Sequence, residues 1–260
     1  MFGIKTKLIE KADEMKYISA MHVAASMCNS EAFGPIRNCN IGKEVVLCGA
    51  GPTLKKYQPI CGAIHIALNR ALLYDKVDFD WFVADDWDGV DFIKDTLQSY
   101  DCKKFFGHQL GANYSDHRQI PETYLRKCGA VRYYTDSYMK PDIWKSKFVC
   151  DIDKMAIANM PNIALSAMQI ALFSNPDRIY LVGCDASSGH FAKPKNLSQE
   201  RISKHEKDIA VAVSSNRVVD KWRELKEFAN TFYPDIEIVS INPVGLKGIF
   251  KDQYQLYSGE

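Results

Sequence analysis

The chain has 260 residues, of which 47% are hydrophobic and 25% charged, and its formal net charge is +1. This composition is typical of a globular protein with one large α/β domain. The small net charge excludes the strongly basic field of a nucleic-acid-binding protein. No apolar run approaches the roughly 20 residues that a membrane-spanning helix needs. The eight cysteines lack CxxC or Cys/His spacing, which favours reduced thiols in a cytoplasmic protein over a disulfide scaffold or a zinc site.

The N-terminal region has a helical pattern of apolar residues from 4 to 29. The pattern is amphipathic and does not resemble a signal peptide. Its periodicity is loose, so the helix is expected to pack on the rest of the domain or on a partner. We predict an N-terminal helix and linker over residues 1–42, followed by a single nucleotide-binding α/β domain over residues 43–260.

The first predicted strand of that domain is the apolar run Val45–Leu47, which leads into a glycine-rich turn. A run with β-branched residues that ends in glycines is typical of a buried parallel strand. Gly49 and Gly51 allow the backbone to turn tightly or to approach a ligand, and Pro52 and Thr53 suit the first turn of a helix whose free N–H groups favour a phosphate. The turn matches neither the GxGxxG fingerprint nor a Walker A loop. A plain strand-to-turn connection without a ligand is the alternative.

Further strands and helices follow in an alternating order. Strands are predicted over residues 63–68, from 79 to the acidic pair at 85 and 86, and over 103–107, 130–134, 178–182 and 236–241, and helices over 162–173 and 210–233. Residues 109–154 lack clean periodicity and predict a lid-like insertion. The alternation predicts a Rossmann-like, mostly parallel sheet with helices on both faces. Ligands of such sheets bind outside the carboxyl ends of the strands.

Polar residues follow several of these strand ends. Asn69 can donate to and accept from a base or ribose, although a simple turn explains it equally well. Asp85 and Asp86 could hold Mg²⁺ beside phosphates, with a solvated acidic loop as the alternative. No other cofactor is indicated.

Two histidines are candidates for acid–base chemistry. His190 lies in a Ser-Ser-Gly-His loop after the strand at 178–182, where an imidazole could reach a bound acceptor. His205 is the competitor, because its polar segment could fold over the substrate. The absence of a GxSxG elbow excludes a serine hydrolase of the α/β type.

Four motifs together resemble two related groups of proteins. GAGPTLKKY from residue 49, a strand that ends at Asn69, IALFSNPDRIYLVGCDASSGH from residue 170 and INPVGLKG from residue 241 stand in the same order as in these groups. One group is the family-42 glycosyltransferases, which include the CMP-sialic acid-dependent sialyltransferases. The other is the MptE-like (DUF115) superfamily, which includes a 6-hydroxymethylpterin diphosphokinase.

The resemblance implies a GT-A-type fold and a set of nucleotide-binding residues. In the sialyltransferases the glycine turn, the Asn and the Gly-x-Asp loop surround the cytidine nucleotide, and a histidine is the base. The residues assigned to the nucleotide site are Gly49, Ala50, Gly51, Pro52, Thr53, Asn69, Asp85, Asp86, Asn162, Asp185, Ala186, Ser187 and Ser188. Asp85 and Asp86 would also be the metal ligands if the reaction depends on a metal.

The chain departs from the sialyltransferase pattern in two respects. Ala50 stands where that family has Asn, and the tyrosines expected around residues 186–191 are absent, which weakens the case for CMP-sialic acid. We expect a glycosyltransferase that moves a sugar, sialic acid or a related one, from a nucleotide-activated donor, CMP-linked by preference, to a cell-surface glycan. The alternatives are an MptE-like diphosphokinase and a non-catalytic nucleotide-binding protein. The expected location is the cytoplasm. Peripheral contact with the inner face of the membrane is compatible with the sequence, and so is a homo-oligomer.

Overall fold

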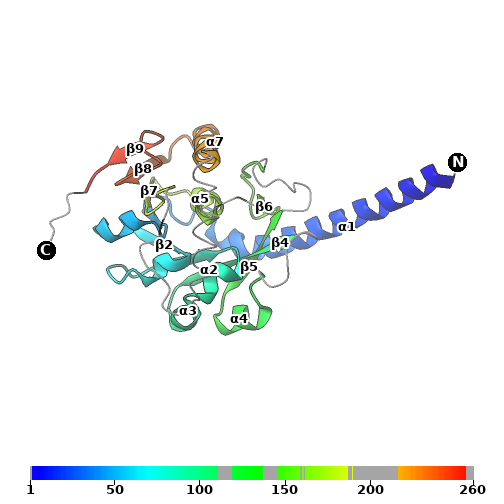
Figure 1. Ribbon diagram of the computed structural model, residues 1–260, viewed down its shortest axis with the longest axis horizontal. Helices are drawn as coiled ribbons and strands as arrows, with labels where there is room; N and C mark the ends of the chain where they lie inside the picture. Colours follow the sequence, from blue (N-terminus) through cyan, green and yellow to red (C-terminus); the bar gives the residue numbers. More distant parts are fainter. Residues whose placement is uncertain are drawn as a thin grey trace.

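The protein is an α/β structure built on one nine-stranded sheet, as seen in a computed structural model that describes residues 2–110, 119–136, 146–158, 160, 162–186, 189 and 216–255 (Figure 1). The strands are β1 (Glu44–Cys48), β2 (Ile64–Leu68), β3 (Trp81–Ala84), β4 (Lys103–Leu110), β5 (Val131–Asp136), β6 (Ile157–Ala158), β7 (Arg178–Val182), β8 (Glu237–Ile241) and β9 (Lys251–Gln253). The α-helices are α1 (Phe2–Phe33), α2 (Trp87–Asp91), α3 (Lys94–Ser99), α4 (Glu122–Lys127), α5 (Ile163–Phe173) and α7 (Arg217–Phe232). Three 3₁₀ turns are η1 (Gly34–Ile36), η2 (Pro52–Lys56) and η3 (Asn69–Leu73).

The strand order across the sheet is β6-β5-β4-β3-β2-β1-β7-β8-β9, and every pairing among these strands is parallel. The predicted parallel α/β sheet is therefore confirmed. β1 lies between β2 and β7, and its residues Val45–Cys48 have no exposed surface. A strand buried on both faces has to be apolar along its whole length, which is why the run was recognisable in the sequence.

Helices cover both faces of the sheet, as predicted. One core cluster includes the end of α1, the inner faces of α5 and α7, and β-strand residues such as Leu47 and Val83. The second cluster lies on the opposite face, with η2, η3, α2, α3 and α4. Figure 1 shows α5 and α7 on one side of the strands and α2, α3 and α4 on the other.

The long helix α1 confirms the predicted N-terminal helix and extends it to Phe33. Its C-terminal end is anchored, because Ala32 and Phe33 are buried in the core and the Asn29 side chain accepts a hydrogen bond of 2.7 Å from the backbone N–H of Tyr134. Toward the N-terminus the helix projects away from the sheet (Figure 1). None of the helices in the described ranges has the length and apolar content that a membrane crossing requires.

The segment that was expected to be a lid-like insertion takes part in the sheet. Residues 109–154 contain α4 and β5, and β5 pairs with β4 over six residue pairs from Phe105↔Val131 to Leu110↔Asp136. The strand predicted over residues 130–134 is confirmed as β5, so this part of the expected insertion belongs to the sheet. Residues 111–118 and 137–145 lie outside the described ranges.

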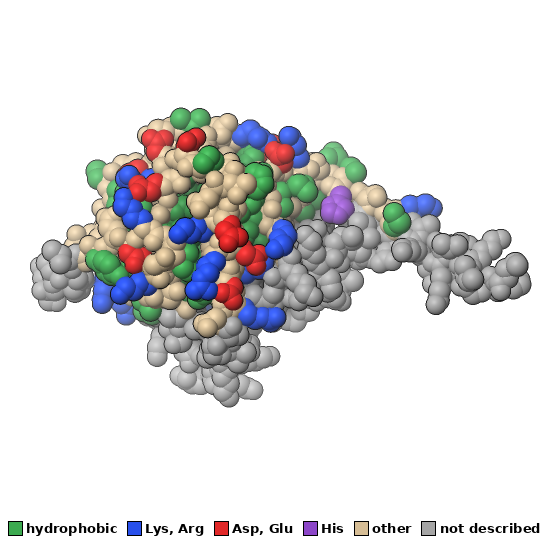
Figure 2. All heavy atoms as spheres, turned by 90° about the horizontal axis from the view of Figure 1, so that it is seen from above, with side chains coloured by type: hydrophobic (Ala, Val, Ile, Leu, Met, Phe, Trp, Pro, Cys, Tyr) green, Lys and Arg blue, Asp and Glu red, His purple; other side chains and the backbone are tan. Residues whose placement is uncertain are grey.

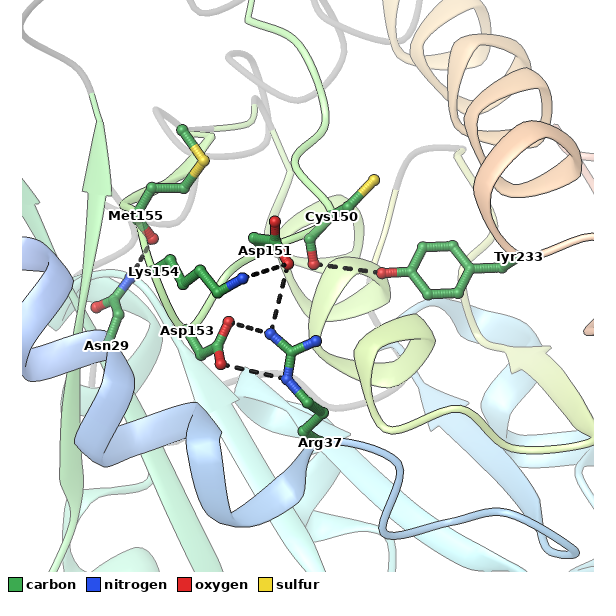
Figure 3. A network of polar contacts seen from close by, with 8 residues as sticks. All are labelled: Asn29, Arg37, Cys150, Asp151, Asp153, Lys154, Met155 and Tyr233. Carbon is green, nitrogen blue, oxygen red and sulfur yellow. Dashed lines mark hydrogen bonds and ion pairs between the residues drawn. The ribbon is translucent and has the colours of Figure 1, made fainter.

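A network of polar contacts holds the segment before β6 against the rest of the chain (Figure 3). Arg37, just after η1, bonds to Asp151 and Asp153, and Lys154 lies 3.6 Å from Asp151. The Tyr233 hydroxyl at the end of α7 donates to the carbonyl of Cys150 at 3.4 Å. These contacts fix the position from which β6 and then α5 start.

Charged side chains of both signs are interspersed over the face of the molecule shown in Figure 2. The described residues on that face form no large area of a single sign, in keeping with the net charge of +1. A mixed surface of this kind gives no electrostatic attraction for a polyanion.

Candidate functional site

The strand order reverses at β1. The chain places β2 to β6 successively on one side of β1, and then crosses over through α5 to place β7, β8 and β9 on the other side. In open parallel sheets the crevice outside the carboxyl ends of the strands at such a reversal is the usual place of a ligand. Here the two loops that meet at this point are the glycine turn after β1 and the Gly-x-Asp loop after β7.

These two loops are packed directly against each other. The N–H of Gly49 donates to Val182 O at 2.7 Å, and the N–H of Gly51 donates to Gly183 O at 2.8 Å. A Cβ atom on either Gly49 or Gly51 would come 2.5 Å from Gly183 O. Gly183 itself has a φ of +61°, which favours glycine. The glycines are therefore required by the contact between the loops, whether or not a ligand also approaches them.

The Asp185 side chain of the Gly-x-Asp loop also bonds to the glycine turn. The residue is 5% exposed, and its Oδ2 accepts a hydrogen bond of 2.9 Å from the Thr53 N–H. The Thr53 hydroxyl donates to Oδ1 of the same carboxylate. Burial raises the pKa of Asp185 above its ordinary value, and the two Thr53 hydrogen bonds oppose that rise.

The expected phosphate site at the start of a helix has a different structure. Pro52 does begin a helical turn, but η2 is a five-residue 3₁₀ turn and not an α-helix. The Thr53 N–H, which was expected to be free for a phosphate, is bonded to Asp185. So short a turn lacks the aligned peptide dipoles of a longer helix. The helical turn at Pro52 was therefore predicted correctly, but the prediction of a longer helix after it was wrong.

The INPVGLKG motif supports the Gly-x-Asp loop. The Gly245 N–H donates to Asp185 O at 2.8 Å, and a Cβ on Gly245 would come 2.7 Å from Ala186 O. Ala186 has a φ of +44°, so this loop leaves its strand through a left-handed residue. Three of the four motifs that define the resemblance are thus brought into one contact region.

Asn69 lies one strand further along the same edge. It is the first residue of η3 and has a φ of +48°. Its side-chain Oδ1 is buried and has no hydrogen-bond partner in the part of the chain that the structure describes. Gly89 of α2 packs against the amide, because a Cβ there would come 2.5 Å from Oδ1. A buried acceptor without a donor is costly, so this atom is a candidate for a ligand or water contact.

The acidic pair Asp85 and Asp86 follows β3, as predicted, but the two side chains have different partners. Asp86 caps α2, with its Oδ1 accepting from the Gly89 N–H at 2.7 Å. Asp85 accepts a hydrogen bond from the Tyr133 hydroxyl of β5. Among the described residues no group of three or more His, Cys, Asp or Glu side chains is placed to hold a metal ion. The Asp86 carboxylate is engaged by its own helix and the Asp85 carboxylate by Tyr133, so the two side chains do not form a pair directed at one point.

The other predicted residues are distributed as follows. Asn162 is the N-cap of α5, and its Oδ1 accepts from the Ala164 N–H at 2.8 Å. Ser187, Ser188, His190 and His205 lie outside the described residues. Two residues that the sequence did not single out belong to this edge: Tyr133, which bonds to Asp85, and His108 of β4, whose ring lies 5.2 Å from that of Tyr134. Both are in strands with weak patterns, and their neighbours become known only from the strand order.

Comparisons with known proteins give structural likenesses only. The chain matches no family model and no curated protein sequence. Similar solved structures include the sialyltransferase CstII from Campylobacter jejuni in complex with the substrate analogue CMP-3FNeuAc, with a TM-score of 0.42, 12% identity, and coverage of 76% of this chain and 80% of that one. The MAf glycosyltransferase from Magnetospirillum magneticum AMB-1 has a TM-score of 0.49 and 12% identity over 91% of this chain and 38% of that one. Both are glycosyltransferases, the class whose motifs the sequence resembles. At these TM-scores the likeness to either structure is partial.

Proposed function

We propose that the protein is a glycosyltransferase that moves a sugar from a nucleotide-activated donor to a glycan acceptor. The observation that carries the proposal is the meeting of the glycine turn and the Gly-x-Asp loop at the point where the strand order reverses. The same motifs in the same order are those of the family-42 glycosyltransferases. Their convergence at the usual ligand position of a parallel sheet favours a nucleotide site there.

The nucleotide would lie over the carboxyl edge near β1, β2 and β7. Asn69 offers a buried acceptor for a donor group of the base or ribose. Thr53 and Asp185 bond to each other, so their role is to hold the two loops in place.

The reaction would be a direct displacement at the anomeric carbon. The acceptor hydroxyl oxygen forms the new bond to that carbon, the bond from the carbon to the phosphate oxygen breaks, and the electron pair leaves with the nucleotide. The hydroxyl proton passes to a base, for which His190 is the candidate. No step of this scheme requires a metal ligand from the described residues.

Nucleotide-dependent thermal stabilisation tests the proposal. The melting temperature is measured with CMP, UDP, GDP and ATP, each with Mg²⁺ and with EDTA, because a ligand that binds only the folded state raises stability by mass action. We expect one nucleotide to raise the melting temperature strongly and the shift to persist in EDTA. Transfer of radiolabelled sugar from the matching sugar nucleotide then confirms the activity. No shift with any nucleotide, or a shift that appears only with ATP and Mg²⁺, would contradict the proposal.

Two matched variants show whether the binding is at the predicted edge. Asn69→Gly removes the buried amide, and Asn38→Gly removes an exposed one from the turn before β1; both residues have positive φ, so glycine fits each backbone. Asn69→Gly should weaken nucleotide binding by about tenfold, the effect of one lost hydrogen bond in a buried site. Asn38→Gly should leave the affinity unchanged. Equal affinities in the two variants would place the nucleotide elsewhere.

A further inference from the structure

Asp85 is the centre of a polar cluster on the side of the sheet that faces α5. The Tyr133 hydroxyl of β5 donates to its Oδ1. The Ser166 hydroxyl of α5 is among the groups that influence this carboxyl, but it is buried and makes no hydrogen bond within the described residues. Gly107 of β4 leaves the space that the carboxylate occupies, since a Cβ there would come 2.6 Å from Oδ1 and 3.2 Å from Tyr133 Cζ. We call Asp85, Gly107, Tyr133 and Ser166 the Asp85 cluster. Three neighbouring elements are thus shaped around one carboxylate.

Asp85 is a half-buried acidic group that has no cation beside it among the described residues. Burial raises the pKa of Asp85 to about 6, the hydrogen bond from the Tyr133 hydroxyl opposes this rise, and the charge of Asp86 adds to it. Within the described ranges, no lysine, arginine or histidine is among the groups that act on it. Burying a carboxylate without a counter-ion is unfavourable, and a protein usually avoids it unless the charge is used.

A purely structural role would not need the charge. Asparagine has nearly the same shape and could accept the same hydrogen bond from Tyr133. A carboxylate differs in having acceptor capacity for about four hydrogen bonds and no donor. A further buried hydroxyl, that of Thr135, follows Tyr133 on the same face of β5 and has no partner in the described part of the chain. The surroundings of Asp85 therefore hold polar groups that a hydroxyl-rich ligand would satisfy.

We propose that the Asp85 cluster binds hydroxyl groups of the donor's sugar, and that this sugar is neutral rather than a sugar acid such as sialic acid. This inference rests on the proposed function and adds the class of donor to it. Asp85 lies two strand positions from β1, which at the usual strand spacing is about 10 Å from the reversal point. That is the distance at which the sugar ring would follow a phosphate bound near the glycine turn.

The sign of the charge decides between the two classes of sugar. Hydroxyl groups of a neutral sugar donate hydrogen bonds to a carboxylate, and such charge-assisted bonds are strong. The carboxylate of a sugar acid has no proton to donate at neutral pH and carries the same charge as Asp85. In a partly buried site this repulsion between like charges should make the acid bind less tightly than the neutral sugar.

The test compares sugar nucleotides with their own bare nucleotides. Each affinity is measured by calorimetry at pH 8 and expressed as a ratio to the affinity of the bare nucleotide. UDP is the reference for UDP-glucose and UDP-glucuronic acid, GDP for GDP-mannose and CMP for CMP-sialic acid. We expect the neutral sugars to strengthen binding and UDP-glucose to bind at least about tenfold more tightly than UDP-glucuronic acid. At pH 5, where Asp85 is protonated and the uronic acid is still ionised, the preference should shrink.

Variants assign the preference to the cluster. Asp85→Asn should reduce the preference for UDP-glucose over UDP-glucuronic acid by about tenfold, and Tyr133→Phe should weaken it. The matched controls are Asp80→Asn, at the opposite end of β3, and Tyr124→Phe, whose hydroxyl donates to Lys94 O at 2.7 Å. Both controls should bind as the wild type does.

The outcomes separate this inference from the proposed function. If a bare nucleotide binds but the sugar acid is accepted as well as the neutral sugar, or Asp85→Asn leaves the ratio unchanged, the inference is overturned and the glycosyltransferase proposal stands. If no nucleotide binds to the wild type, the proposed function itself fails, and the donor assignment fails with it.

Discussion

Gly51 lies directly against Asp185, although the two residues belong to loops that follow different strands. A Cβ atom on Gly51 would come 2.7 Å from the carboxyl carbon of Asp185 and 2.5 Å from Gly183 O. The glycine turn, which in the sequence suggests a place where a phosphate approaches the backbone, has its space occupied by a neighbouring loop. The two loops are therefore packed together by their own contacts, and a ligand would bind to the surface that they form.

The first prediction follows from this contact. Gly51→Ala should destabilise the protein by about 1–3 kcal/mol, because the added methyl group must displace the Gly-x-Asp loop. Urea unfolding measures the loss. Gly34→Ala is the matched control, since a Cβ at Gly34 meets nothing within 4 Å, and its effect should stay within about 0.5 kcal/mol. Equal stabilities for the two variants would show that the loops can separate without cost. A change of nucleotide affinity in Gly51→Ala is therefore no clean sign of a direct ligand contact.

The second prediction concerns the hydroxyl that ties the same loops together. Thr53→Val keeps the shape of the side chain but removes a donor to the buried Asp185 carboxylate. We expect a loss of about 1–3 kcal/mol in the free energy of unfolding, the usual effect of leaving a buried acceptor without its donor. Thr231→Val on α7 is the control, because its exposed hydroxyl donates to a helix carbonyl, that of Glu227, at 2.8 Å. The idea fails if Thr53→Val is no less stable than Thr231→Val.

Most of the sheet could be predicted because its inner strands are apolar runs. β1, β2, β3 and β7 are each bounded by polar residues or glycine, and their ends were placed within about two residues, as is usual for strong patterns. α7 was recognisable from the spacing of its apolar residues, of which Trp222 and Leu225 are buried. β9 was missed, because Lys251–Gln253 is an edge strand whose residues are exposed or half-buried and carry no apolar run.

The residues at the strand ends could also be predicted, but their partners could not. Tyr133 and Asp85 are 48 residues apart in the chain, and only the adjacency of β3, β4 and β5 brings them together. The glycines were recognised as places of close approach, yet a sequence does not say which atoms approach. Gly51 faces Asp185, and two glycines that the sequence did not single out, Gly89 and Gly107, face Asn69 and Asp85.

The third prediction is a stability difference that depends on pH. The pKa of Asp85 is raised by burial to about 6, so the folded state binds this proton more tightly than the unfolded state does. Wild-type stability should therefore fall as pH rises from about 4 to 6, with a total contribution of about 3 kcal/mol at most for a shift of roughly two units.

Asp85→Asn removes this titration, so the variant should be more stable than the wild type above pH 6, and the difference should disappear near pH 4. Urea unfolding at a series of pH values measures it. Asp80→Asn, which changes an exposed carboxylate just before β3, is the control for replacing an aspartate in the same region. A variant less stable than the wild type at pH 7 would mean that the Asp85 charge is compensated in the folded protein. The expected gain on mutation is typical of a group kept for function at the expense of stability.

The last prediction assigns the base of the transfer reaction. His190 comes shortly after β7 in the sequence, and β7 ends at the edge of the sheet where the glycine turn and Asn69 lie. A general base contributes about 10²–10⁴-fold to the rate, so His190→Ala should lower turnover by this factor and leave nucleotide binding nearly intact. It should also remove the acidic limb of the pH–rate profile, because below the imidazole pKa the base is already protonated and cannot accept the acceptor's proton. His205→Ala is the comparison: it should chiefly raise KM for the acceptor. Turnover is measured for both variants from pH 5 to 9 at saturating donor. If His205→Ala is inactive and His190→Ala retains normal turnover and both limbs, the base lies in the segment around His205.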